Sequence, residues 1–179
     1  DAQQPVVAGR LDSILSTIRE LLEPQFQHSE TALTIELPAA VMPGNLGVAD
    51  SEQIQAALLN LLQNALEACR PRGTVRVTVS VLDALIQVDV LDNGPGVADA
   101  VHGKIFEAFV TGKSEGVGLG LTLASQVAES TGGSLSYERM GEWIDRIGWE
   151  RFFDLTGIPF AVQLIDDFTM ATDTFRSTP

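Results

Sequence analysis

Three short motifs follow one another along this chain, and together they restrict its fold more than any other feature. A helical stretch carries Asn60 and Asn64, a turn reads Asp92-Asn93-Gly94-Pro95-Gly96, and a glycine run reads Gly116-Val117-Gly118-Leu119-Gly120-Leu121. One glycine run alone is weak evidence. The ordered set predicts a pocket built from a carboxylate, two glycine turns and a pair of amides on one helix face.

The two amides, Asn60 and Asn64, are four residues apart, so on a helix they share one face. The leucines around them predict that this face is partly buried, and buried amides need hydrogen-bond partners. An amide oxygen is a suitable ligand for Mg²⁺, which usually completes its shell with waters and substrate phosphates. We therefore predict a magnesium and phosphate site here. A helix packed on polar backbone is the alternative.

Asp92 ends a predicted strand and enters the first glycine turn. A carboxylate at that place can accept a hydrogen bond from an exocyclic amine, which would select adenine over guanine. Gly94 and Gly96 let the backbone approach a flat ring without a Cβ clash. The alternative is an ordinary Asp-Asn-Gly turn between a strand and a helix.

The second glycine run, with Gly116, Gly118 and Gly120, precedes a predicted helix. The free N–H groups at a helix N-terminus bind phosphate oxygens. Dinucleotide binding is the competing interpretation, but no strand immediately precedes this run and no paired βαβ unit follows it. A Gly-Lys-Ser/Thr phosphate loop is absent from the sequence. We expect this run to bind the phosphates of a nucleotide.

Composition narrows the classes of partner. Of 179 residues, 45% are hydrophobic and 20% charged, which is typical of a globular domain. The net charge of −13 argues against nucleic acid, because phosphate backbones require a basic surface. The two lysines, Lys104 and Lys113, both lie near the glycine run, and Cys69 is the sole cysteine. No apolar run approaches a membrane span and no signal peptide is visible, so we expect no membrane contact and a cytoplasmic location.

Hydrophobic periodicity predicts the order of helices and strands. The expected helices cover residues 10–23 (ended by Pro24), 50–69 (capped by Asp50 or Ser51), 98–106, 119–130 and 142–155, the last kinked at Gly148. The expected strands cover residues 32–37, 74–81, 85–91, 134–138 and 160–165, with the second and third forming a hairpin. After residue 140 the composition shifts, because both tryptophans and five phenylalanines lie in the last 39 residues.

Four segments resemble the boxes of the histidine-kinase ATP-binding domain. Residues 58–65, Leu-Leu-Asn-Leu-Leu-Gln-Asn-Ala, resemble its N box, and Asp92-x-Gly94-x-Gly96 its G1 box. Phe106-Glu107-Ala108-Phe109 resembles the F box, and residues 116–121 the G2 box. The wider group includes type II topoisomerases, Hsp90 chaperones, mismatch-repair ATPases and anti-sigma-factor kinases. The resemblance covers about residues 10–138 and implies an α/β fold: a two-layer sandwich (Bergerat ATP-binding fold) whose mixed sheet carries helices on one face.

The resemblance also implies roles for individual residues. Asn64 should bind Mg²⁺, Asn60 should help to hold the phosphates, Asp92 should read adenine, and Lys113 should reach the terminal phosphates of ATP. Phe106 and Phe109 should anchor the first hinge of a short lid, like that of nitrogen-regulation sensor kinases. The remaining expected nucleotide contacts are Gly94, Gly96, Thr111, Gly116, Gly118, Leu119, Gly120 and Leu121.

Asn60 separates this chain from the ATP-hydrolysing relatives, which by the same resemblance carry a glutamate at its position to activate water. An amide cannot act as a general base at neutral pH. The pocket is therefore expected to bind ATP and present its γ-phosphoryl group for transfer, with little hydrolysis, and Asn60 and Lys113 are its expected catalytic residues.

The phosphoacceptor is expected outside this chain. His28 and His102 are the only histidines, and neither lies in the family's His-Glu/Asp pattern followed by proline, so both are expected to be solvated surface residues. The implied partners are a helical hairpin that carries the acceptor histidine and, through it, a response regulator. The alternatives are a serine kinase of the anti-sigma-factor type and a catalytically inactive, nucleotide-dependent binding module.

The C-terminal segment departs from the family pattern, which calls for a tight turn and a last strand after residue 138. We divide the chain into an ATP-binding domain, residues 1–140, and an atypical aromatic-rich segment, residues 141–179. Residues 160–165 are either the last strand after an insertion at 142–157, or part of a foreign tail. Residues 141–160 resemble the C-terminus of the dissimilatory sulfite reductase β subunit, as a chimera would, but no redox ligands accompany them.

Overall fold

A computed structural model describes residues 8–37, 46–69, 71–82, 85–113, 116–139 and 161–166. The helices are α1 (Leu11–His28), α2 (Ser51–Ala68), α3 (Asp99–His102) and α4 (Gly120–Ser130). The strands are β1 (Gly9–Arg10), β2 (Ala32–Glu36), β3 (Gly47–Val48), β4 (Thr74–Leu82), β5 (Leu85–Asp92), β6 (Ser134–Arg139) and β7 (Ala161–Asp166). The predicted helix at 142–155 lies outside the described residues.

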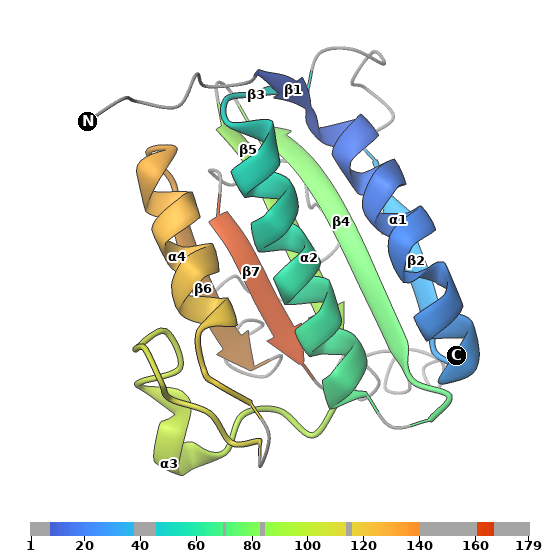
Figure 1. The fold of residues 1–179 in the computed structure, drawn as a ribbon, viewed down its shortest axis with the longest axis vertical. Coiled ribbons are helices and arrows are strands. Elements are labelled where there is room, and N and C mark those ends of the chain that lie inside the picture. The colour runs from blue at the N-terminus through green and yellow to red at the C-terminus, as the bar shows by residue number, and fades with distance from the viewer. Residues whose placement is uncertain are drawn as a thin grey trace, which may run out of the picture.

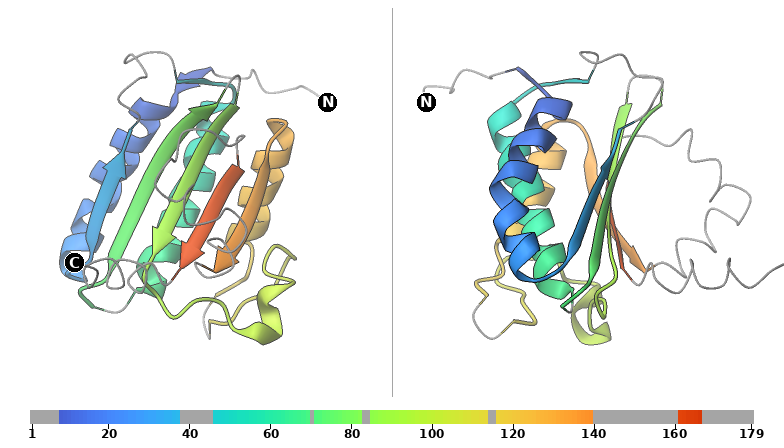
Figure 2. Two further views of the ribbon diagram at one scale, coloured as in Figure 1. Left: turned by 180° about the vertical axis from the view of Figure 1, so that it is seen from behind. Right: turned by 90° about the vertical axis from the view of Figure 1, so that its right-hand side faces the viewer.

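The described elements form two layers. Five strands make one mixed sheet in the order β2-β4-β5-β7-β6, and α1, α2 and α4 all cover the same face of it (Figures 1 and 2). β1 and β3 form a separate antiparallel pair. The predicted hairpin is confirmed, because β4 and β5 pair antiparallel from Leu82↔Leu85 to Val75↔Asp92. The two-layer α/β sandwich with helices on one face is therefore the observed architecture.

The core lies between the helices and the sheet. Strand side chains alternate between faces, so one face of β4 and β5 supplies valines to the core. The core residues, all buried, are Leu11, Ile14, Leu15, Ile18, Leu22, Phe26, Ile54, Leu58, Leu61, Leu62, Ala65, Val75, Val77, Val79, Val88, Val90, Ala124, Ala128 and Leu135, with Leu46 beside them. This packing holds α2 and α4 side by side and thereby brings the amide motif of α2 close to the start of α4.

The prediction that Pro24 ends the first helix is wrong. α1 runs through Pro24 to His28. A proline inside a helix removes one backbone hydrogen bond and costs about 3 kcal/mol. Leu22 and Phe26, on either side of it, are both buried in the core, and this burial favours continuing the helix for another turn. Tertiary packing therefore overrides the local preference of proline.

The expected cap of α2 and the expected helix at 98–106 also differ from the structure. Asp50 precedes α2 with a left-handed φ of 56°, and its carboxylate accepts a hydrogen bond from the Gln53 side chain (2.6 Å) rather than capping a backbone N–H. In the second region only Asp99–His102 is helical, and turns follow to residue 109. Gly103, directly after α3, has poor helix propensity, which is consistent with the early end.

β7 lies inside the sheet between β5 and β6. In the sequence it begins and ends one residue after the predicted strand at 160–165. It pairs parallel with both neighbours, through Val88↔Val162 on one side and Leu135↔Val162 on the other. Parallel neighbours cannot be joined by a tight hairpin, because the chain must return to the other end of the sheet. The tight turn of the family pattern is therefore incompatible with this pairing, whereas a long connection such as residues 140–160 is required by it.

The face of β5 that points away from the helices carries a buried polar pair. Gln87 Nε2 donates a hydrogen bond to Asp89 Oδ1 (2.7 Å), and only 5% of Asp89 is exposed. Burial raises the pKa of the Asp89 carboxyl to about 6, and the bond from Gln87 only partly offsets this rise. The folded protein therefore binds a proton at Asp89 more tightly than the unfolded chain does.

We expect Asp89→Asn to stabilise the protein at neutral pH and not at pH 4. The pKa of Asp89 in the folded state exceeds its ordinary value near 3.9, so its contribution to stability is full below about pH 4 and is lost as pH rises through 6. An asparagine keeps the acceptor for Gln87 without the buried charge, which favours the variant by about 3 kcal/mol above pH 7. Urea unfolding at pH 4 and pH 7.5 measures the difference. An equal difference at both pH values would contradict the assignment.

Among the described residues, no helix combines the length and the apolar character that crossing a membrane would require.

Candidate functional site

The asparagine pair meets the start of α4. Asn60 and Asn64 lie on α2, are half-buried, and both face Gly120, the first residue of α4. A Cβ atom at Gly120 would lie 3.6 Å from Asn60 Oδ1 and 3.6 Å from Asn64 Nδ2. The structure thus brings together the first and third motifs, which are more than 50 residues apart in the sequence. The packing of α2 against α4 is the cause.

The Asp92 turn is built around its own carboxylate. Asp92 Oδ1 accepts a hydrogen bond from the Gly94 backbone N–H (2.8 Å), and Asp92 is only 9% exposed. A Cβ at Gly94 would lie 2.8 Å from the carbonyl oxygen of Ala68, at the end of α2. This position therefore accepts glycine only, and the close approach fixes the turn against α2. Gly96 adopts a left-handed φ of 73°.

Asn93 and Cys69 hold this turn in a way that the sequence analysis missed. Asn93 Oδ1 accepts hydrogen bonds from the Thr74 backbone N–H (2.7 Å) and from the Cys69 thiol (3.4 Å). Burial, and then the nearby charge of Asp92, raise the pKa of the Cys69 thiol, so it stays neutral and can donate. An asparagine in a turn commonly accepts backbone hydrogen bonds, so the residue type of Asn93 indicated this role. Its partners, Thr74 and Cys69, are distant in sequence and could not be identified from it.

In the segment from Phe106 to Gly118, backbone contacts hold the residues around Phe109 against Gly118. The Phe109 N–H donates to the Gly118 carbonyl (2.9 Å), and both residues have positive φ, 67° and 73°. A Cβ at Gly118 would lie 2.7 Å from the Val110 carbonyl oxygen, so this crossing needs glycine. Phe106 packs against the core, whereas Phe109 is 74% exposed and contributes through its backbone. Within this pair, Phe106 alone anchors the segment by its ring.

Lys113 reaches from this segment back to α2. Its Nζ donates to Asn64 Oδ1 (3.1 Å) and also forms an ion pair with Glu67. The Lys113 backbone N–H donates to Thr111 Oγ1 (3.1 Å), and a Cβ at Gly116 would lie 2.8 Å from that same hydroxyl oxygen. Thr111, Lys113 and Gly116 therefore lie close together. Glu67 is a member of this cluster that sequence reasoning missed.

The start of α4 has no side-chain cap among the described residues. Leu119 occupies the N-cap position without a side-chain capping hydrogen bond, and Leu121 packs against the core. Uncapped backbone N–H groups with the positive end of the helix dipole favour phosphate. In this region the structure gathers a carboxylate, two amides, an ammonium group and a helix N-terminus. Groups of these kinds have the chemistry to bind a purine base and a phosphate chain.

The expectation that both histidines are solvated holds for His28 and is wrong for His102. His28 ends α1 and is exposed. His102 is half-buried, and its ring packs edge-on against Tyr137 with centroids 5.2 Å apart. Tyr137 also accepts a hydrogen bond from the Val97 backbone N–H (3.1 Å). These contacts hold residues 97–102 against β6. No local sequence pattern predicts them.

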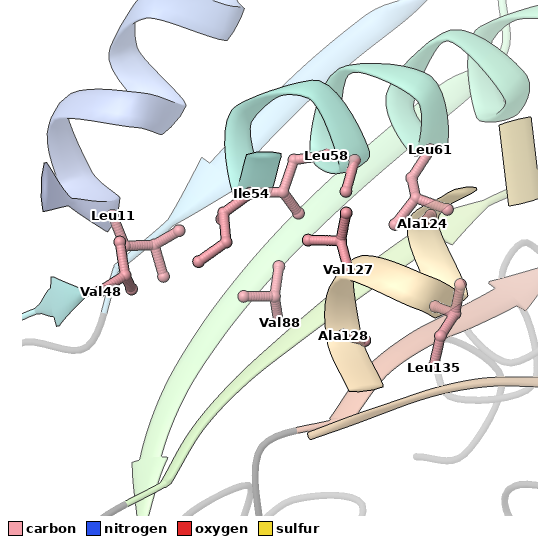
Figure 3. Close-up of a pocket in the computed structure, with 11 residues that line it drawn as sticks. Leu11, Val48, Ile54, Leu58, Leu61, Val88, Ala124, Val127, Ala128 and Leu135 are labelled. Atoms are coloured by element: carbon pink, nitrogen blue, oxygen red, sulfur yellow. The ribbon is translucent and has the colours of Figure 1, made fainter. Parts of the chain in front are cut away.

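A small apolar pocket lies elsewhere, between α2, α4 and the sheet (Figure 3). Its volume is about 30 Å³, and its lining includes Leu58, Val88 and Val127. None of the predicted site residues lines it. It is a packing gap between the helices and the sheet rather than part of the predicted site.

Comparison with known proteins agrees with this geometry. Residues 49–148 match the family described as histidine kinase-, DNA gyrase B- and HSP90-like ATPase. The sensory histidine kinase/phosphatase NtrB of Rhodobacter capsulatus is 37% identical over 110 residues, which cover 54% of this chain and 30% of that protein. The C4-dicarboxylate transport sensor protein DctB of Rhizobium meliloti is 33% identical over 120 residues, 66% of this chain and 19% of that protein.

Solved structures of the same type share the fold. The catalytic domain of histidine kinase ThkA superposes with a TM-score of 0.63 at 26% identity, covering 72% of this chain and 82% of that one. Full-length ShkA in complex with AMPPNP superposes with a TM-score of 0.61 at 29% identity, and the match covers 73% of this chain and 27% of ShkA. The chain thus spans less than a third of these two curated relatives but most of an isolated catalytic domain. Its sequence, its sheet and its site together make this chain a member of the histidine kinase-, DNA gyrase B- and HSP90-like ATPase family.

Proposed function

We propose that this chain is the catalytic module of a sensor histidine kinase, which binds Mg–ATP and presents the γ-phosphoryl group to a histidine on a separate helical hairpin. The observation that carries the proposal is the convergence of Asn64, Lys113 and Gly120 at one point of the fold. The relatives named as sensor histidine kinases support it, as does the neighbour solved with AMPPNP.

The donor set fits the nucleotide. Asp92, fixed by Gly94, would accept the exocyclic amine of adenine, and the glycine backbone would lie along the ring. Asn64 would supply an amide oxygen to Mg²⁺, while Asn60 and the N–H groups at the start of α4 would hold phosphate oxygens. When bound, Mg–ATP supplies the transferable phosphoryl group. The residues of this chain orient it and neutralise its charge.

Asn60 is the residue that we expect to limit hydrolysis. It stands beside Gly120 and Asn64, where a general base would be able to activate water, and an amide does not accept a proton at neutral pH. The phosphoryl group would therefore be kept for the acceptor histidine. A helical hairpin and a response regulator are the partners that this activity needs, and a cytoplasmic location is part of the same proposal.

For the domain boundaries, we propose that residues 1–140 form the ATP-binding domain and that the atypical segment 141–179 completes its sheet with β7. The parallel pairing of β7 between β5 and β6 supports this division. It also favours an insertion after β6 over a wholly foreign tail.

Calorimetric titration tests the nucleotide site directly. We expect ATP and ADP to bind more tightly with Mg²⁺ than without it, and GTP to bind weakly or not at all. Asp92→Asn keeps an acceptor for the Gly94 N–H but replaces a carboxylate oxygen by an amide, so ATP affinity should fall roughly 10- to 100-fold. Asp12→Asn is the matched control, because Asp12 forms an ion pair with Arg10 at the start of α1. Equal binding of ATP and GTP would refute the adenine assignment.

Phosphotransfer is tested with radiolabelled ATP and hairpin domains of sensor kinases. An acid-labile phosphate on the hairpin supports the histidine-kinase proposal. An acid-stable phosphate would indicate serine transfer, as in the anti-sigma-factor kinases. Tight ATP binding without transfer to any hairpin would favour a nucleotide-dependent binding module instead.

A further inference from the structure

Glu67 contacts the proposed phosphate-binding lysine. It lies three residues after Asn64, so the two side chains share a face of α2. Lys113 Nζ contacts both of them, although it lies 46 and 49 residues away in sequence. The sequence motifs that describe the nucleotide site do not include Glu67. Its contact with Lys113 therefore requires its own explanation.

Fold stability does not explain this ion pair. The side chains of Lys113 and Glu67 are 45% and 59% exposed. Ion pairs exposed to this extent contribute little to stability, because water screens the charges and two long side chains lose freedom. The Lys113 turn is already closed by the bond from its N–H to Thr111. The Lys113–Glu67 ion pair instead fixes the position of the Lys113 ammonium group.

The hydrogen bonds of Lys113 leave room for a phosphate. An ammonium group has three donors, and Asn64 and Glu67 use two of them. If Asn64 binds Mg²⁺, repulsion between the cations disfavours the Lys113 contact with Asn64. Glu67 then remains as the protein partner that keeps the ammonium group at the site. Lys113 in turn neutralises a carboxylate that would otherwise repel a triphosphate.

We propose that Glu67 is a positioning residue, which holds Lys113 beside Asn64 so that the ammonium group reaches the terminal phosphate of ATP. This inference rests on the proposed function. It predicts a role that depends on the γ-phosphate, because ADP lacks the group that Lys113 is proposed to contact. A purely structural role for Glu67 would affect ATP and ADP alike.

The first test compares ATP with ADP. Glu67→Gln should weaken Mg–ATP binding about three- to fivefold, the upper part of the range expected for one exposed ion pair, and leave Mg–ADP within twofold. Lys113→Ala should show the same selectivity with a larger effect. In the Lys113→Ala background, Glu67→Gln should cause no further loss of affinity, because the residue acts through Lys113. Glu52→Gln, an exposed glutamate in the first turn of the same helix, is the matched control.

The second test needs no nucleotide. The chain has two lysines, so the side-chain ¹⁵N signals of Lys113 and Lys104 are readily distinguished by NMR. Glu67→Gln should shift or broaden the Lys113 signal and leave Lys104, on the exposed turn after α3, unchanged. An unchanged Lys113 signal would mean that Glu67 does not hold the lysine, and would overturn the inference whatever the binding data show.

The outcomes separate the inference from the proposed function. A wild-type protein that binds no ATP refutes the proposed function and the phosphate role of Glu67 with it. If ATP binds, equal losses for ATP and ADP, additive effects with Lys113→Ala, or tighter ATP binding by Glu67→Gln would each overturn the inference alone.

Discussion

Asn64→Ala should abolish the magnesium-dependent part of ATP binding. Asn64 is proposed to give Mg²⁺ its one protein oxygen, and its Oδ1 already faces a cation, the Lys113 ammonium group. Alanine removes that oxygen and leaves the metal to water and phosphate alone. A polar interaction with a charged group is worth about 1.5–3 kcal/mol, so affinity should fall roughly 10- to 100-fold. Titration with ATP, with and without Mg²⁺, measures the loss.

Two further variants sharpen this result. Gln55→Ala, a half-buried polar position nine residues earlier on α2, should leave nucleotide affinity unchanged. Asn64→Asp keeps an oxygen ligand and adds a negative charge, so it should retain the response to Mg²⁺. Circular dichroism should show intact folding for all three proteins, because Asn64 is only half-buried. Full magnesium dependence in Asn64→Ala would remove Asn64 from the metal site.

Truncation after Arg139 should unfold the protein, whereas truncation after Asp166 should not. The shorter chain loses β7, which pairs with four residues of β5 and with six of β6. Without β7, an interior gap separates β6 from β5, and both strands expose unpaired backbone. Domains are stable by only about 5–15 kcal/mol, and the loss of an interior strand exceeds what such a margin tolerates.

Thermal and urea unfolding of the two truncated proteins decide this prediction. The chain ending at Asp166 keeps every described strand and should unfold cooperatively, near the midpoint of the full chain. The chain ending at Arg139 should show no cooperative transition and should aggregate through its exposed strand edges. If both proteins unfold cooperatively with the same midpoint, β7 is dispensable, and the proposal that the C-terminal segment completes the sheet is incorrect.

Local chemistry accounts for the elements that could be predicted from the sequence. The apolar stripe of α2 and the alternating valines of β4 and β5 are periodic within single segments, so periodicity alone locates them. Gly94 and Gly118 stand where the backbone crosses another carbonyl, and such positions show in the sequence because only glycine fits. The motifs of the candidate site were visible for the same reason.

Contacts between distant segments account for what the sequence did not reveal. Pro24 stays helical because Phe26 is buried, and His102 is partly covered because Tyr137 lies on β6. The pairing of Glu67 with Lys113 depends on a turn 46 residues away. The contacts of His102 and Glu67 leave no periodic or compositional trace, since each joins segments that are distant in the sequence and meet only in the folded protein.

The sequence by itself determined which residues are candidates to bind a nucleotide, because amides, a carboxylate and glycine turns have fixed chemistry and local geometry. It also determined the alternation of helices and strands. Only the tertiary structure decided that Asn60, Asn64, Gly120 and Lys113 meet at one point, and that β7 enters the sheet parallel to both neighbours. The physical reason is that strand order and side-chain convergence follow from burying the whole core at once, which no segment does alone.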